Sequence, residues 1–125
     1  MLAEFSAGEG AGSGMDELSL AGPSAVCEVA GGLVRELTVD PSALGLKTCA
    51  LAELRGGDRT ENAAILTAIL DGTERGPRRD IVAPNAAAGF LIAGLVPDLP
   101  AGLALAIEQI DTRRALAKLH VLQRV

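Results

Sequence analysis

Residues 26–39 read VCEVAGGLVRELTV, two β-prone runs separated by the dipeptide Gly31-Gly32. Paired glycines between such runs favour a two-residue turn, because both central positions of that turn need a positive φ. We therefore predict an antiparallel β-hairpin over this stretch. In this pairing Arg35 lies opposite Glu28, where the two side chains can form a surface ion pair.

After the hairpin the pattern changes to a helical period, broken by Gly and Pro turn signals. The expected helices run from an Asp58 cap to Gly72, over about 78–93, from Pro100 past Ile110, and from 113 to about 123. Asp58 and Glu61 have the spacing of a capping box, which favours a helix start there. Asp111-Thr112 is the expected cap of the last helix, and Pro84 predicts a kink or break inside the second.

These elements predict one partial domain over residues 1–125. Its expected parts are a glycine-rich loop over 1–14, an acidic loop and hairpin over 15–40, and helices over 58–124. As an isolated chain, the fold class is α+β and mostly helical, with an antiparallel hairpin followed by several packed helices.

Composition restricts the partners. Aromatic residues are 2% of the 125 residues, too few for the stacking surface that single-stranded nucleic acid requires. The net charge of −5 provides no basic field for nucleic acid or an anionic membrane, so we expect neither partner. No apolar run reaches about 18 residues, and the start of the chain lacks a basic signal-peptide region. We expect a cytoplasmic protein.

The stretch GSGMDELSL, residues 12–20, places Asp16 and Glu17 between glycines and a short apolar run. Adjacent carboxylates in such a loop are hard oxygen ligands of the kind that Mg²⁺ takes, usually together with substrate phosphates. The residues alone favour a solvated acidic turn or a helix cap over a metal site.

Other candidate groups favour structural roles. Cys27, Cys49 and His120 form no recognisable metal or catalytic set, free thiols are favoured over a disulfide, and no catalytic residue is predicted. Gly56-Gly57 could approach an anion at a helix start, but a simple cap is favoured. Asn85 is a polar residue in an apolar context, and we expect its partner to be backbone freed by Pro84.

The segment GMDELSLAGPS, residues 14–24, resembles the G-(L/M)-D-E-(L/I)-S-x-x-(G/T)-(P/S)-(T/S) segment of anthranilate phosphoribosyltransferases. The hairpin is followed, in the order found in that family, by segments resembling the family's own. They are PSALGL at 41–46, LRGGDRTENA at 54–63, RDIVAPNAA at 79–87, and helices over 104–119. The likeness extends from about residue 12 to the end.

This resemblance implies a function and a fold. Such enzymes transfer the phosphoribosyl group of phosphoribosyl pyrophosphate to anthranilate in tryptophan biosynthesis, and their catalytic domain is α/β. The chain would supply the C-terminal portion of that domain. Carried over by position, Asp16 and Glu17 are the pair that binds the Mg²⁺ accompanying the pyrophosphate.

Several family segments have no counterpart in the sequence, including the N-terminal helical domain, the Gly-Thr-Gly-Gly-Asp loop and the arginine that helps to hold anthranilate. Substrate-binding residues are therefore unassigned, and we expect the chain to be inactive alone. It would be a truncated reading frame, a fragment, or one half of a split enzyme that needs a missing N-terminal part. The alternatives are a self-associating, non-catalytic helical module and a related pentosyltransferase with another acceptor.

Overall fold

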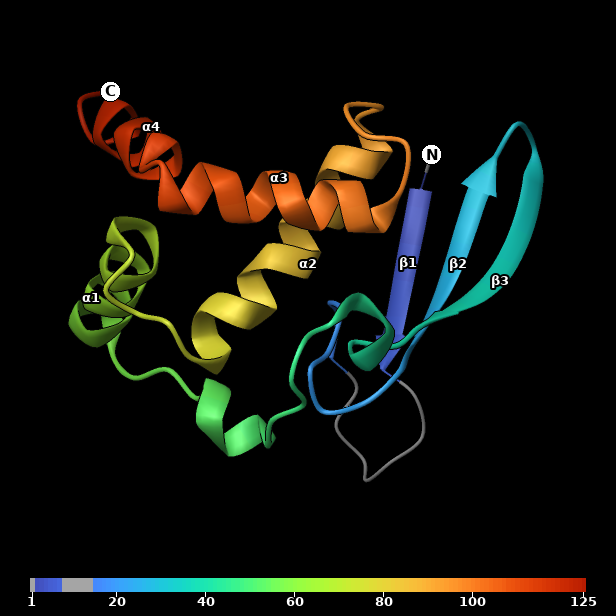
Figure 1. Ribbon diagram of the computed structural model, residues 1–125, viewed down its shortest axis with the longest axis horizontal. Coiled ribbons are helices and arrows are strands. Elements are labelled where there is room, and N and C mark those ends of the chain that lie inside the picture. Colours follow the sequence, from blue (N-terminus) through green and yellow to red (C-terminus); the bar gives the residue numbers. More distant parts are fainter. Residues whose placement is uncertain (1, 8–14) are drawn as a thin grey trace.

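A computed structural model of the chain describes residues 2–7 and 15–125. Within these residues a three-stranded antiparallel sheet lies to one side of four α-helices (Figure 1). The strands are β1 (Leu2–Ala7), β2 (Ser24–Ala30) and β3 (Leu33–Val39), in the order β1-β2-β3. The helices are α1 (Arg59–Asp71), α2 (Pro77–Ile92), α3 (Leu99–Asp111) and α4 (Arg114–Leu122). The predicted hairpin followed by packed helices is confirmed.

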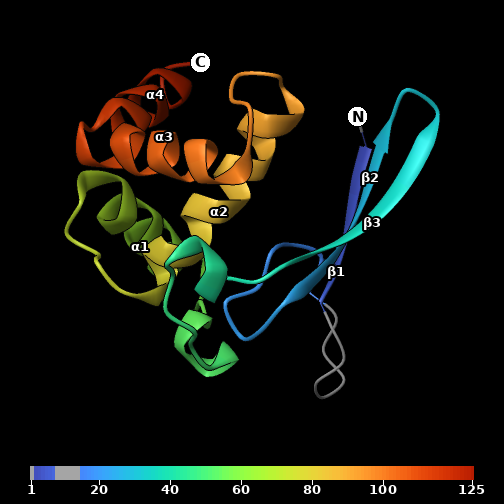
Figure 2. The ribbon, with the colours of Figure 1, turned by 45° about the vertical axis from the view of Figure 1, so that its right-hand side comes forward.

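The β2–β3 hairpin has the predicted turn. Gly31 and Gly32 have φ values of +58° and +78°, as a turn with two left-handed central residues requires. Glu28 pairs with Arg35 in the register, and their side chains form the expected ion pair. The hairpin extends away from the helices (Figure 2), and Leu33 beside its turn is 75% exposed. Only the base of the hairpin contributes to the core.

The expected loop over residues 1–14 is wrong for its first part. Leu2–Ala7 forms β1 and pairs with β2 from Leu2↔Val29 to Ala7↔Ser24. The pairing partner lies more than 15 residues away, and local glycine content carries no information about it. The rest of that expected loop, and most of the glycine-rich segment, lies outside the described residues.

The core has two clusters of buried apolar residues, both of which contain side chains of α2. One consists of Leu18, Val26, Val39 and Ala88, and the other of Ala83, Ala87, Leu103 and Ala106. Small residues bring α2 and α3 close together. A Cβ on Gly102 would lie 2.9 Å from the carbonyl oxygen of Ala87, so this crossing requires glycine.

Two short 3₁₀ turns connect the sheet to α1. They are η1 (Ser42–Leu44) and η2 (Leu51–Leu54). The Asp58–Glu61 capping box is confirmed at the start of α1: the Glu61 N–H donates to Asp58 Oδ1 over 2.9 Å, and the Asp58 N–H donates to Glu61 Oε2 over 2.8 Å.

The last two helices start differently from each other. Asp98 caps α3 by accepting a hydrogen bond from the Ala101 N–H. The cap expected for α4 at Asp111-Thr112 is absent, because the Asp111 carboxylate is engaged with arginines and the Thr112 hydroxyl donates to the Glu108 carbonyl. Instead, Arg113 precedes α4 with a φ of +60° and no side-chain cap. Among the described residues, no helix is long and apolar enough to cross a membrane.

Candidate functional site

Asp16 and Glu17 form an exposed bend that leads directly into the core. Both carboxylates face solvent, and neither forms a hydrogen bond or ion pair with another residue in the described part of the chain. The next three residues are buried, with exposed fractions of 2% for Leu18, 7% for Ser19 and 0% for Leu20. The backbone that carries the two carboxylates is therefore anchored by the buried residues that follow it.

Asn85 of α2 binds the backbone of this loop through its side-chain amide. The Leu18 N–H donates to Asn85 Oδ1 over 2.8 Å, and Asn85 Nδ2 donates to the Leu18 carbonyl over 3.0 Å. Asn85 Nδ2 also donates to the Ile81 carbonyl over 2.9 Å. The expected partner of Asn85 was backbone freed by Pro84, which is the carbonyl of Asp80. The observed partners are also backbone, but two of the three bonds reach the acidic loop.

The segment after Leu18 is held by further polar contacts. The Ser19 N–H donates to the hydroxyl of Ser24, which is 0% exposed. The Ala21 N–H donates to the Ser19 hydroxyl, and the Cys49 N–H donates to the Leu20 carbonyl. Because buried backbone groups need partners, these contacts select one loop conformation.

The donor set of the acidic pair suits Mg²⁺. Mg²⁺ prefers carboxylate oxygens and is commonly held by one or two carboxylates, with waters and substrate phosphates completing its six ligands. Asp16 and Glu17 provide two such groups, and no cluster of three or more potential ligands occurs within residues 2–7 and 15–125. The pair could serve as one side of a metal site shared with a phosphorylated substrate.

The chain matches a known family over most of its length. The family model of the glycosyl transferase family, a/b domain, matches residues 8–116. The chain belongs to this family. Among curated relatives, the anthranilate phosphoribosyltransferase of Caulobacter vibrioides is 54% identical over 108 residues, which is 86% of this chain and 31% of the relative. That of Chloroflexus aggregans is 46% identical over 108 residues, covering 86% of this chain and 32% of the relative.

Solved structures of the same enzyme are similar in fold. Anthranilate phosphoribosyltransferase from Thermus thermophilus has 42% identity and a TM-score of 0.78, over 87% of this chain and 32% of that structure. The enzyme from Saccharomyces cerevisiae in complex with PRPP and Mg has 26% identity and a TM-score of 0.77, over 86% and 31%. The chain thus spans about a third of the length of these relatives. The resemblance seen in the sequence, and the α/β family fold it implied, are confirmed.

The other candidates in this glycosyl transferase domain have structural roles. At Gly57 the N–H donates to Asn62 Oδ1 over 2.9 Å, and the neighbouring Asp58 N–H is bound by Glu61. The α1 start is therefore a cap, as predicted, and these two amides are already occupied. Cys27 and Cys49 are free thiols.

Cys49 is poorly suited to act as a nucleophile. Burial raises the pKa of its thiol, and the nearby carboxylates of Glu53 and Asp80 raise that pKa further. The thiol therefore stays protonated at neutral pH, whereas the thiolate is the reactive form.

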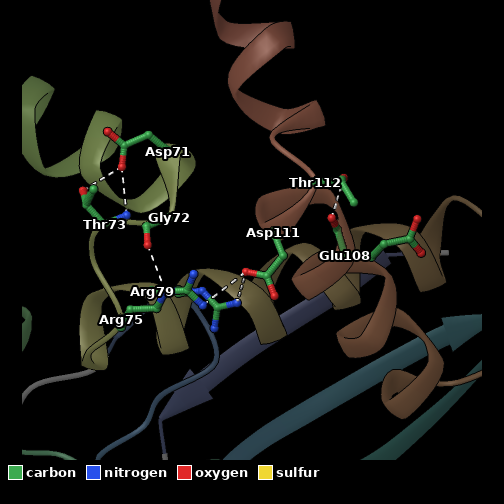
Figure 3. A network of polar contacts seen from close by, with 8 residues as sticks. All are labelled: Asp71, Gly72, Thr73, Arg75, Arg79, Glu108, Asp111 and Thr112. Atoms are coloured by element: carbon green, nitrogen blue, oxygen red, sulfur yellow. Dashed lines mark hydrogen bonds and ion pairs between the residues drawn. The ribbon is translucent and has the colours of Figure 1, made fainter.

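Sequence reasoning missed a polar network that joins the helices of this domain (Figure 3). Arg79 of α2 donates to Asp111 at the end of α3 over 2.9 Å, and Arg75 lies 3.6 Å from the same carboxylate. Thr73 donates to Asp71 through both its backbone N–H and its hydroxyl. No spacing rule links Arg79 to Asp111, because 32 residues separate them.

Proposed function

We propose that this chain is the metal-binding part of an anthranilate phosphoribosyltransferase, which transfers a phosphoribosyl group from phosphoribosyl pyrophosphate to anthranilate. The observation that carries the proposal is the exposed Asp16-Glu17 pair on an anchored backbone, in a chain that is 54% identical over 108 residues to part of such an enzyme. A related solved structure contains PRPP and Mg, which supports the choice of ligands. A cytoplasmic location, expected from the sequence, is part of this proposal.

The roles of the two carboxylates follow from their chemistry. Asp16 and Glu17 would hold Mg²⁺ on the protein side and leave its remaining positions for water and phosphate oxygens. When bound there, the ion would supply positive charge that stabilises the departing pyrophosphate. The residues that follow the pair are buried and anchor its backbone, while both carboxylates face solvent, where their oxygens are available to a substrate.

The test uses the chain together with the remaining two-thirds of a relative, such as the Caulobacter vibrioides enzyme. We expect the mixture to gain Mg²⁺-dependent formation of phosphoribosyl anthranilate, and Asp16→Asn with Glu17→Gln to abolish it. Glu36→Gln, an exposed acid on β3, is the matched control and should retain activity. Full activity of the double variant would exclude the carboxylate pair from the metal site.

A second candidate function is self-association without catalysis. Several large apolar side chains are exposed, and association between copies of the chain would remove some of this apolar surface from water. The most exposed lie at the hairpin turn, after α2 and near the C-terminus: Leu33, Val34, Leu95, Leu122 and Val125. Light scattering at increasing concentration distinguishes the candidates, because a chain that stays monomeric contradicts this one.

A further inference from the structure

The amide of Asn85 pairs with the Leu18 backbone in the manner of a neighbouring β-strand. One oxygen accepts from the Leu18 N–H and one nitrogen donates to the Leu18 carbonyl, at 2.8 and 3.0 Å. The side chain thereby satisfies both polar groups of a residue that is 2% exposed. This contact joins positions 67 residues apart in the chain.

Asn85 is itself held rigidly. It lies within α2 between the buried pairs Ala83-Pro84 and Ala87-Ala88. Its second amide hydrogen donates to the Ile81 carbonyl one helical turn earlier, over 2.9 Å. That bond limits rotation of the side chain, so the amide presents its oxygen and nitrogen to Leu18 in one orientation.

Packing and hydrogen bonding control different features of the acidic loop. The Leu18 side chain packs with Val26, Val39 and Ala88, which fixes where the residue lies. Hydrophobic contact has no directional preference, however, and leaves the rotation of the backbone less restricted. The N–H that binds Asn85 belongs to the peptide group joining Glu17 to Leu18. Fixing that peptide plane fixes φ of Leu18 and the position of the Glu17 Cα, and so the direction in which the acidic pair leaves the core.

We propose that Asn85 is a positioning residue for the metal-binding pair: its clamp on Leu18 sets the orientation of Asp16 and Glu17 toward the cation. This inference rests on the proposed function, since it assigns Asn85 to the same site. Residues that orient ligands without touching the metal commonly change metal affinity by about 10- to 100-fold when they are removed. Asn85 would act in this way through the backbone.

The chain provides a matched control. Asn62 clamps Gly57 in the same way, with the Gly57 N–H donating to Oδ1 over 2.9 Å and Nδ2 donating to the Gly57 carbonyl over 3.0 Å. This second clamp serves the start of α1, and within the described residues none of its hydrogen bonds reaches the acidic loop. Removing the Asn62 clamp shows what the loss of an asparagine–backbone clamp does at a place away from the acidic pair.

The experiment uses Mn²⁺ alone as a paramagnetic probe of the 125-residue chain in solution. Broadening of the backbone amide signals of residues 16–18 is followed as Mn²⁺ is added. We expect the wild type and Asn62→Ala to broaden at similar concentrations. Asn85→Ala and Asn85→Asp should need at least about 10-fold more Mn²⁺ for the same broadening. Asp16→Asn with Glu17→Gln should lose the selective broadening.

The Asn85→Asp variant keeps the test decisive if Asn85→Ala does not fold. Aspartate preserves the side-chain size and the bond from the Leu18 N–H, but it cannot donate to the Leu18 carbonyl. Its added negative charge attracts a cation, so weaker binding in this variant cannot be an effect of charge. Dispersed amide spectra establish that each variant is folded.

The outcomes separate the inference from the function on which it rests. Equal Mn²⁺ dependence in the wild type and the folded Asn85 variants would overturn the positioning role, while the carboxylate pair would stand. A wild type without selective broadening at residues 16–18 would overturn the metal site itself, and the positioning role with it.

Discussion

The guanidinium of Arg79 donates to the carboxylate of Asp111 over 2.9 Å and so connects the first turn of α2 to the last residue of α3. The Arg79 side chain is 12% exposed, whereas that of Asp111 is 42% exposed. Within the described residues, Arg79 Nε is buried without a hydrogen-bond partner. The positive charge of Arg79 is thus nearly buried among the helices, and its main counter-charge is the carboxylate of Asp111.

We expect Asp111→Ala to destabilise the chain more than Arg79→Met does. The first change leaves a buried guanidinium without its partner, at a cost of about 1–3 kcal/mol in the free energy of unfolding. The second removes the buried charge itself and keeps an apolar stem. Urea denaturation measures both, and an equal or larger loss for Arg79→Met would contradict this account. Arg75→Met, which removes the exposed arm of the network, should change stability by about 0.5 kcal/mol or less.

A methyl group at Gly102 should separate α2 from α3. A Cβ there would lie 2.9 Å from the Ala87 carbonyl oxygen and 3.0 Å from its Cα, and backbone cannot easily move aside. We expect Gly102→Ala to lower the free energy of unfolding by about 1–3 kcal/mol. Gly89→Ala is the control, because a Cβ at that exposed position of α2 meets nothing within 4 Å. It should stabilise the helix by about 0.5–1 kcal/mol in thermal unfolding.

The hairpin turn should tolerate asparagine better than alanine. Gly31 has a φ of +58°, which costs an alanine roughly 1 kcal/mol or more, while asparagine visits this region readily. We expect Gly31→Ala to weaken the β2–β3 pairing and Gly31→Asn to retain it. The measurement is amide hydrogen exchange in β3, and faster exchange in the asparagine variant than in the alanine variant would refute the turn assignment.

Asp71 should make stability depend on pH in the acid range. The Thr73 hydroxyl, and then its backbone N–H, hold the pKa of the Asp71 carboxyl below its usual value by hydrogen bonding to the charged form. A lowered pKa in the folded state means that this stabilisation is complete above the unfolded pKa. It is lost as pH falls through the lower folded pKa.

Thr73→Val removes the hydroxyl bond and keeps the side-chain shape. We expect the pKa of Asp71, followed by carboxyl carbon NMR, to rise toward its usual value. The variant should be less stable than the wild type at neutral pH, and the difference should shrink below the folded pKa of the wild type. An unchanged pKa in the variant would show that the Thr73 hydroxyl does not control this carboxyl.

Much of the fold was predictable because its signals are local. The Gly31-Gly32 turn, the Asp58 cap and the end of α1 at Gly72 each depend on a few adjacent residues, and the structure bears them out. Local signals failed where a distant group competed. Asp111 had the form of a helix cap, but its carboxylate binds Arg79 instead. Of the kink or break expected at Pro84, a break does not occur, since α2 runs from Pro77 to Ile92.

The sequence by itself determined the chemistry of the candidate site and the kinds of elements present. Two adjacent carboxylates are oxygen donors suited to a hard cation in any fold, because the type of ligand atom depends only on the residue. Only the tertiary structure decided that β1 completes the sheet and that Asn85 holds Leu18. Both depend on contacts between segments far apart in the chain. Strand pairing uses backbone groups that any residue but proline provides, and nothing near Asn85 in the sequence indicates that its amide binds the Leu18 backbone 67 residues away.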